Sequence, residues 1–107
     1  MEATPTQRTA RKILGLVSKI QNHESVRPAW GGEVYIVKTA EVGTLVRFRN
    51  APEHTHGNSH QRVEAIRITD EGLYLMGHKS TSQGLRISAD TALDIAKRGI
   101  KMNYEIR

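Results

Sequence analysis

Three histidines lie close together in the segment Glu53-His-Thr-His-Gly-Asn-Ser-His60, and their side chains are suited to metal binding or proton transfer. His54 and His56 point to the same side if the backbone there is extended, and His60 could turn back toward them. Three imidazoles with an open fourth position are typical of a catalytic zinc site. A His-x-His pair alone is a weak signal, so we predict no bound metal and no cofactor, and keep His54, His56 and His60 as weak metal candidates.

The same histidines could instead provide the general acid and base of a metal-independent ribonuclease. Arg47 or Lys79 would then hold the phosphate. Nothing in the sequence fixes the geometry of such a site. Nucleophilic catalysis has less support, because the chain has no cysteine and its loop serines are not on a strained turn. We therefore assign no catalytic residue and expect a protein that is not an enzyme.

Arginines on predicted strands form a second chemical pattern. In the predicted strand 44–49 side chains alternate between two faces, so Arg47 and Arg49 project from one surface, roughly 6.5–7 Å apart. A guanidinium grips a phosphate through paired N–H groups, so this spacing suits a nucleic-acid backbone. Cross-strand pairing with Glu33 or Glu64 is the alternative.

The charge of the whole chain favours a polyanionic partner. Its net charge is +5, and the lysines and arginines are spread along the sequence rather than held in a tail. We predict nucleic-acid contacts from Arg47, Arg49, Arg62, Arg67 and Lys79. Trp30, Tyr35 and Tyr74 are candidates for stacking on bases.

The elements that must carry these residues indicate an α+β domain. Thr4, Pro5 and Gln7 mark a helix start through an N-cap hydroxyl, a proline in the first turn and a capping-box partner. Asp70-Glu71-Gly72 lies between two β-branched and apolar runs, which is typical of a hairpin. The predicted elements are a helix at 5–22, strands at 33–38, 44–49, 62–69 and 73–78, a short edge strand at 85–87, a helix at 89–98 stopped by Gly99, and a final strand at 101–107.

This order predicts an N-terminal helix, an antiparallel sheet of four to five strands built from two successive hairpin-like pairs, and a C-terminal helix followed by the final strand. The helices should cover one face of the sheet and leave the other partly open to solvent. We expect a single domain over 1–107, with residues 1–3 frayed and flexible loops at 50–61 and 79–84.

Trp30 is the only tryptophan and lies beside two glycines in a predicted connector at 26–32. It is interpreted either as a plug over the edge of the core or as an exposed anchor for a base or a partner. Trp30, His54, His56 and His60 are therefore the candidate partner-binding residues.

The functional expectation is a small, basic, non-enzymatic protein that binds nucleic acid or a nucleic-acid-handling complex, with a regulatory role. Without cysteine or a long apolar run, we expect a cytoplasmic protein with no membrane partner. One alternative is a protein-binding adaptor or inhibitor that docks through the 50–61 loop, Trp30 or a sheet edge. Another is a nuclease or metal-dependent enzyme that uses the histidines. The final strand leaves a homodimer open.

Overall fold

Two helices and eight short strands form the described part of this computed structural model, which comprises residues 4–41, 43–56, 59–77 and 84–106. In order they are α1 (Pro5–Gln21), β1 (Val26–Pro28), β2 (Val34–Thr39), β3 (Gly43–Phe48), β4 (Glu53–His56), β5 (Ser59–Ile68), β6 (Leu73–Gly77), β7 (Leu85–Ile87), α2 (Ala89–Asn103) and β8 (Tyr104–Ile106). The predicted α+β class with an antiparallel sheet is confirmed. Neither described helix is long and apolar enough to cross a membrane.

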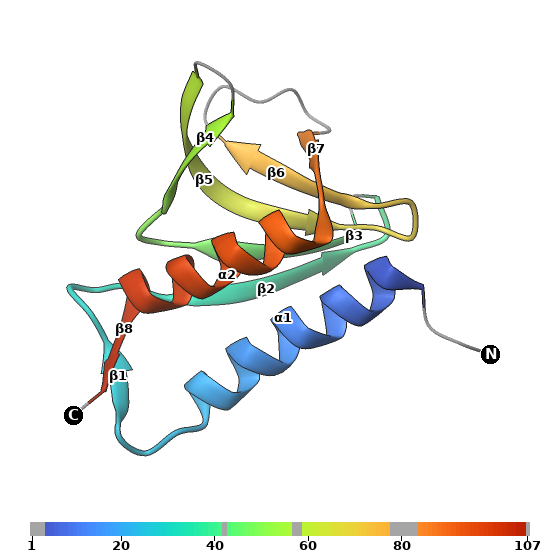
Figure 1. The fold of residues 1–107 in the computed structure, drawn as a ribbon. Helices are drawn as coiled ribbons and strands as arrows, with labels where there is room; N and C mark the ends of the chain where they lie inside the picture. The colour runs from blue at the N-terminus through green and yellow to red at the C-terminus, as the bar shows by residue number, and fades with distance from the viewer. Residues whose placement is uncertain (1–3, 42, 57–58, 78–83, 107) are drawn as a thin grey trace.

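The main sheet is an antiparallel meander with the order β2-β3-β5-β6-β7 (Figure 1). The two predicted hairpins are both present, as β2–β3 and β5–β6. They belong to one sheet because β3 also pairs with the second half of β5, where Arg47 lies opposite Ala65. β4 pairs with the first half of β5, with Glu53 opposite Arg62, so the sheet has more strands than the four to five predicted.

The predicted loop at 50–61 is wrong. Residues 53–56 form β4 and residues 59–61 begin β5, so most of the described part of this segment is strand. The backbone of this polar segment is satisfied by strand pairing instead of by solvent, and the Val63 N–H donates to the Pro52 carbonyl at 2.7 Å where β4 approaches β5. The predicted loop at 79–84 lies outside the described residues except for Gly84, and residues 1–3 lie outside them entirely.

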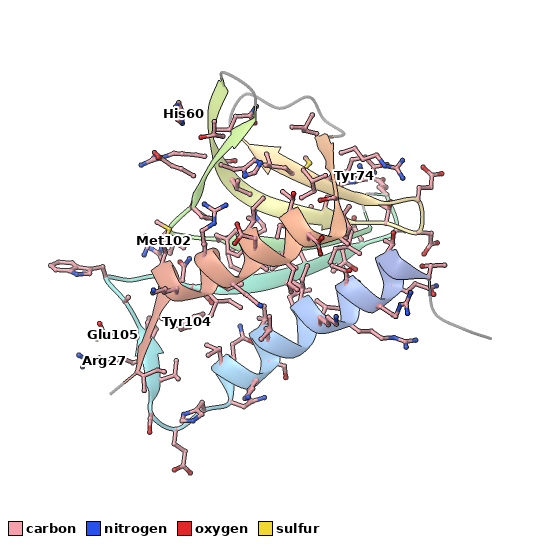
Figure 2. All side chains as sticks on the ribbon, viewed as in Figure 1. Arg27, His60, Tyr74, Met102, Tyr104 and Glu105 are labelled. Atoms are coloured by element: carbon pink, nitrogen blue, oxygen red, sulfur yellow. The ribbon has the colours of Figure 1, made fainter. Side chains whose placement is uncertain are left out.

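The predicted connector at 26–32 contains a strand that the sequence did not indicate. β1 pairs with β8 in a separate two-stranded ribbon, with Arg27 opposite Glu105. An ion pair joins these two side chains (Figure 2). The final strand is therefore shorter than predicted, and its described pairing is with β1 of the same chain.

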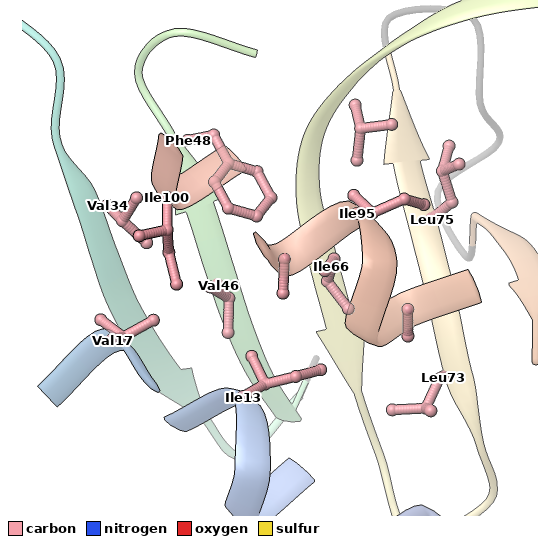
Figure 3. Close-up of a cluster of buried hydrophobic side chains, with 13 residues drawn as sticks. Ile13, Val17, Val34, Val46, Phe48, Ile66, Leu73, Leu75, Ile95 and Ile100 are labelled. Carbon is pink, nitrogen blue, oxygen red and sulfur yellow. The ribbon is translucent and has the colours of Figure 1, made fainter. Parts of the chain in front are cut away.

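The core lies between the two helices and one face of the main sheet. Figure 1 shows α2 crossing the strands with α1 beside it. The core side chains come from α1 (Ile13, Val17), from the strands (Val34, Val46, Phe48, Val63, Ile66, Leu73, Leu75) and from α2 (Ala92, Ile95, Ala96, Ile100) (Figure 3). With both helices on this side, the opposite face of the sheet stays uncovered.

The capping box predicted for α1 is present. Thr4 Oγ1 accepts from the Gln7 backbone N–H at 3.1 Å, and Gln7 Oε1 accepts from the Thr4 N–H at 3.0 Å. These two bonds satisfy N–H groups that have no partner within the helix.

Replacing Thr4 with alanine should lower the free energy of unfolding by about 1 kcal/mol, because the N-cap acceptor is lost. Urea denaturation of Thr4→Ala measures this effect, and Thr4→Ser is the control because serine keeps the hydroxyl. Equal midpoints for the wild type and both variants would show that the box does not stabilise the chain.

α2 begins as predicted, with Ser88 Oγ accepting from the Thr91 N–H at 3.2 Å. It does not stop at Gly99 but continues to Asn103, so the predicted helix end at 98 is wrong. The structure gives Gly99 a role other than ending the helix. A Cβ added there would lie 2.5 Å from Cδ1 of Phe48, so the missing side chain lets α2 approach the ring.

Candidate nucleic-acid interface

The uncovered face of the main sheet carries tyrosine and arginine side chains. Val34 on β2 and Val46 on β3 are fully buried in the core. The next residues along each strand, Tyr35 and Arg47, lie opposite each other and therefore point to the uncovered face. Tyr35 is 41% exposed and Arg47 is half-buried. The alternation predicted for these two strands is thus the alternation observed.

A cavity of about 590 Å³ opens on this face where β3 and α2 both end. Its lining includes Tyr35, Arg47, Arg49, Arg62, Glu64 and Met102. Three of the five predicted nucleic-acid-binding arginines and lysines therefore meet at one place, although Arg62 is far from the other two in sequence.

The local structure of β5 explains how Arg62 and Glu64 reach this cavity. Val63 between them is fully buried, so its neighbours on either side point away from the core. The pairing of β5 with β6 contains a β-bulge between Val63 and Ala65. The extra residue at a bulge lets Glu64 and Ala65 both face the uncovered side, where Ala65 lies opposite Arg47.

Positive charge dominates the lining of the cavity. Three guanidinium groups line it against the single carboxylate of Glu64. Ion pairs join Arg27 to Glu105 and Arg98 to Asp94 elsewhere in the described residues. Within the same part of the chain the side chains of Arg47, Arg49 and Arg62 form neither an ion pair nor a hydrogen bond. The alternative that these arginines neutralise Glu33 or Glu64 is therefore not supported, and the cavity presents excess positive charge.

Arg67 lies on the same uncovered face but outside the cavity. It is opposite Tyr74 on β6, and its Cζ lies 4.8 Å from the centroid of the Tyr74 ring, a cation–π contact. On β7, Arg86 is opposite Tyr74 and donates from Nη2 to the Glu71 carbonyl at 3.1 Å. Basic and aromatic groups thus continue across the sheet to its far edge.

The histidines do not come together as the metal hypothesis requires. In the β4–β5 hairpin His54 is opposite Gln61, whereas His60 is opposite Thr55, so His54 and His60 lie on opposite faces. His60 Nδ1 is 2.9 Å from Thr55 Oγ1, within hydrogen-bond distance. The described residues contain no group of three His, Asp or Glu side chains placed to hold a metal ion. The His56 side chain and Lys79 lie outside the described part.

Trp30 is 100% exposed, so its interpretation as a plug over the core is wrong. It is the first central residue of a tight turn in which the Gly32 N–H donates to the Ala29 carbonyl at 2.7 Å. φ is 47° at Trp30 and 71° at Gly31. Positive φ at both central residues is the pattern of a type I′ turn, which favours Asn-Gly and strains a bulky side chain.

Known proteins do not suggest a function for this arrangement. No family model matches the chain, and no curated protein or solved structure is significantly similar to it. The function must therefore be inferred from the side chains themselves.

Asn50, Met102 and Asn103 are site residues that the sequence prediction missed. Met102 was assigned to the final strand, but it lies in the last turn of α2, and its side chain is 45% exposed beside the cavity (Figure 2). Ile100, four residues after Ala96, continues the apolar stripe past Gly99 and was the one signal of a longer helix. The two asparagines carry no comparable signal, since their roles depend on contacts distant in sequence.

Proposed function

We propose that the chain is a non-enzymatic nucleic-acid-binding protein, acting on nucleic acid directly or within a complex that handles it. The observation that carries this proposal is the convergence of Arg47, Arg49 and Arg62 at one cavity, where their guanidinium groups have no ion-pair or hydrogen-bond partner among the described residues. Guanidinium groups bind phosphate oxygens through two parallel N–H bonds, and each phosphate they neutralise releases counterions. The site therefore has the chemistry that a phosphate backbone requires.

Two further features favour a nucleic acid over an isolated phosphate. The net charge of +5 attracts a polyanion along its length rather than at one point. Tyr35 lies directly across from Arg47, and the Arg67–Tyr74 pair lies farther along the same face. Alternating cations and aromatic rings on an uncovered sheet suit a chain of phosphates and bases.

The histidine-dependent nuclease has less support, since the hairpin register separates His54 from His60. A protein-binding adaptor is the second candidate, and the complete exposure of Trp30 favours it. The nucleic-acid-binding protein and the adaptor differ in the partner that they bind. An adaptor should not bind added nucleic acid and should bind one protein at a near-equal molar ratio.

The test is fluorescence anisotropy of labelled single- and double-stranded DNA and RNA, titrated with the protein between about 50 and 200 mM salt. We expect micromolar or tighter binding whose affinity falls steeply as salt rises. In the double variant Arg47→Ala/Arg49→Ala the affinity should fall by roughly tenfold or more, because two charge-assisted contacts are lost. The slope of log K against log salt should become less steep by about 1.4 to 1.8.

The matched control removes the same charge from another surface. Arg8 and Lys12 lie on α1, are exposed, and line neither this cavity nor the one beside Arg67. The double variant Arg8→Ala/Lys12→Ala should keep affinity within a few-fold of the wild type at about 150 mM salt. Equal losses in both double variants would indicate nonspecific attraction and rule out this site, and absence of binding to all four nucleic acids would rule out the function.

A further inference from the structure

Trp30 is a feature of the fold that the arginine cavity alone does not explain. A large aromatic ring is held entirely in solvent, on a backbone conformation that bulky residues rarely adopt. Asparagine or glycine would make the same turn without strain. The tryptophan therefore contributes nothing to the turn or to the core, and strain of this kind is found where a side chain must be presented for binding.

The turn that carries Trp30 is bonded to the wall of the arginine cavity. Asn50, which lines the cavity, donates from Nδ2 to the carbonyl of Ala29, the residue before Trp30, at 3.2 Å. The Ala29 N–H donates to the carbonyl of Asn103 at 2.9 Å. On the other side of Trp30, a Cβ on Gly32 would lie 2.7 Å from Asn103 Cα, so the turn sits directly on the end of α2. The backbone of the turn is thus fixed to a residue of the cavity wall, and its two glycines line a neighbouring cavity together with Arg49.

The ring of Tyr35 lines the cavity itself. Tyr35 is 41% exposed and lies opposite Arg47, while Met102 adds an apolar surface that is 45% exposed. The cavity therefore combines three cations with an exposed aromatic ring, and the turn that carries Trp30 is bonded to Asn50 in its wall. The guanidinium groups can bind phosphates, and the aromatic rings can stack only on bases whose faces are exposed.

We propose that the nucleic acid is single-stranded, with an unpaired base stacked on the Trp30 indole, its neighbour on Tyr35, and the phosphates on Arg47, Arg49 and Arg62. This inference rests on the proposed function. In a duplex the faces of the bases are already stacked on one another, so a duplex can offer phosphates and groove edges but not base faces. An unpaired strand of DNA or RNA offers both the phosphates and the base faces.

The intrinsic fluorescence of the protein tests this inference directly, because Trp30 is the only tryptophan. The wild-type protein is titrated with unlabelled oligo(dT), oligo(U) and a long blunt DNA duplex at low salt, and anisotropy with labelled versions measures binding in parallel. Stacking of a base on the indole should quench its emission with the two single strands in proportion to binding. The duplex should leave the emission unchanged at equal occupancy, and the comparison of oligo(dT) with oligo(U) distinguishes DNA from RNA.

Two variants separate stacking from a structural role of Trp30. Trp30→Asn suits a type I′ turn, so it keeps the fold while removing the ring, and it should lower single-strand affinity roughly tenfold without changing duplex affinity. Trp30→Phe keeps a ring and should retain most of the single-strand affinity. Tyr35→Ala should behave like Trp30→Asn, and Tyr35→Phe like the wild type.

The outcomes distinguish the two proposals. Binding of single strands without quenching, or with unchanged affinity in Trp30→Asn, would overturn the stacking inference and leave the arginine site in place. An equal loss for single strands and duplex would also overturn it. If wild-type protein binds none of the nucleic acids, the proposed function itself fails, and Trp30 becomes an anchor for a protein partner.

Discussion

Replacing Asn103 with leucine should lower the free energy of unfolding by about 3–4 kcal/mol, because several buried or partly buried backbone groups would lose their partners. The Asn103 side chain is fully buried and makes four hydrogen bonds. Oδ1 accepts from the N–H groups of Glu33 and Asn50 at 2.9 and 2.8 Å. Nδ2 donates to the carbonyls of Asn50 and Gly99 at 2.9 and 2.7 Å. Leucine has a similar size and can replace none of these bonds.

The expected loss of stability in Asn103→Leu depends on the backbone groups that would have no hydrogen-bond partner. Two N–H groups and the Asn50 carbonyl would be left without their partner in a partly buried site, and each unsatisfied group costs about 1–3 kcal/mol before relaxation. A domain of this size has a total stability of about 5–15 kcal/mol, so the loss is a large share of it. Thermal denaturation should show it clearly, at roughly 4–8 °C for each kcal/mol.

Asn22→Leu is the control for this substitution. Asn22 is exposed at the C-cap of α1, and its side chain makes one long hydrogen bond, from Nδ2 to Ser18 Oγ at 3.4 Å. The same chemical change there should alter stability by about 0.5 kcal/mol or less. Similar melting temperatures for Asn103→Leu and Asn22→Leu would contradict the role of Asn103 as the support shared by β2, β3 and α2.

Features encoded within a few residues were predictable from the sequence. The start of α1 follows from Thr4 and Gln7, whose hydrogen bonds join positions three apart. The β5–β6 hairpin follows from the Asp70-Glu71-Gly72 tip, where the Thr69 and Gly72 backbones bond to each other at 3.0 and 3.3 Å. Alternation along the predicted strand 44–49 also assigned Arg47 and its neighbour Val46 to opposite faces, as observed.

Features that depend on distant contacts were not predictable in this way. β1 is a strand because it pairs with β8. The final strand was predicted from its alternation, but nothing in residues 26–28 marked them as its partner. β4 and the first half of β5 carry polar residues and histidines, which resemble a loop until they are paired with each other. The face of Arg47 on its strand was predictable, and Arg49 follows directly after the end of β3 at Phe48. Their meeting with Arg62 and Met102 required the bulge in β5 and the full length of α2.

At Gly99 the local sequence predicted a helix end, whereas the structure shows a close contact between α2 and Phe48. Replacing Gly99 with alanine should therefore change the stability in the opposite direction to the same replacement at Gly15. Both glycines lie inside helices, where alanine is intrinsically better by about 1 kcal/mol. Gly15 is exposed, and a Cβ added there would meet nothing within 4 Å. Gly15→Ala should therefore raise the free energy of unfolding by about 0.8–1 kcal/mol.

Gly99→Ala should instead lower the free energy of unfolding by about 2 kcal/mol, because overpacking of the core costs more than the gain in helix propensity. The added Cβ would lie 2.5 Å from Cδ1 of Phe48 and closer still to its Cε1, distances that require the ring or α2 to move. Phe48 is 5% exposed and packed among other core residues, so the ring has little room to yield.

A double-mutant cycle tests whether Phe48 causes the loss of stability expected in Gly99→Ala. Phe48→Leu removes the ring edge that faces Gly99, so Gly99→Ala should cost less in that background than in the wild type. Urea denaturation of the four proteins gives the coupling free energy, which should be about 1 kcal/mol in favour of the double variant. Additive losses, or a stabilising Gly99→Ala, would mean that contact with the Phe48 ring is not the reason for glycine at this position.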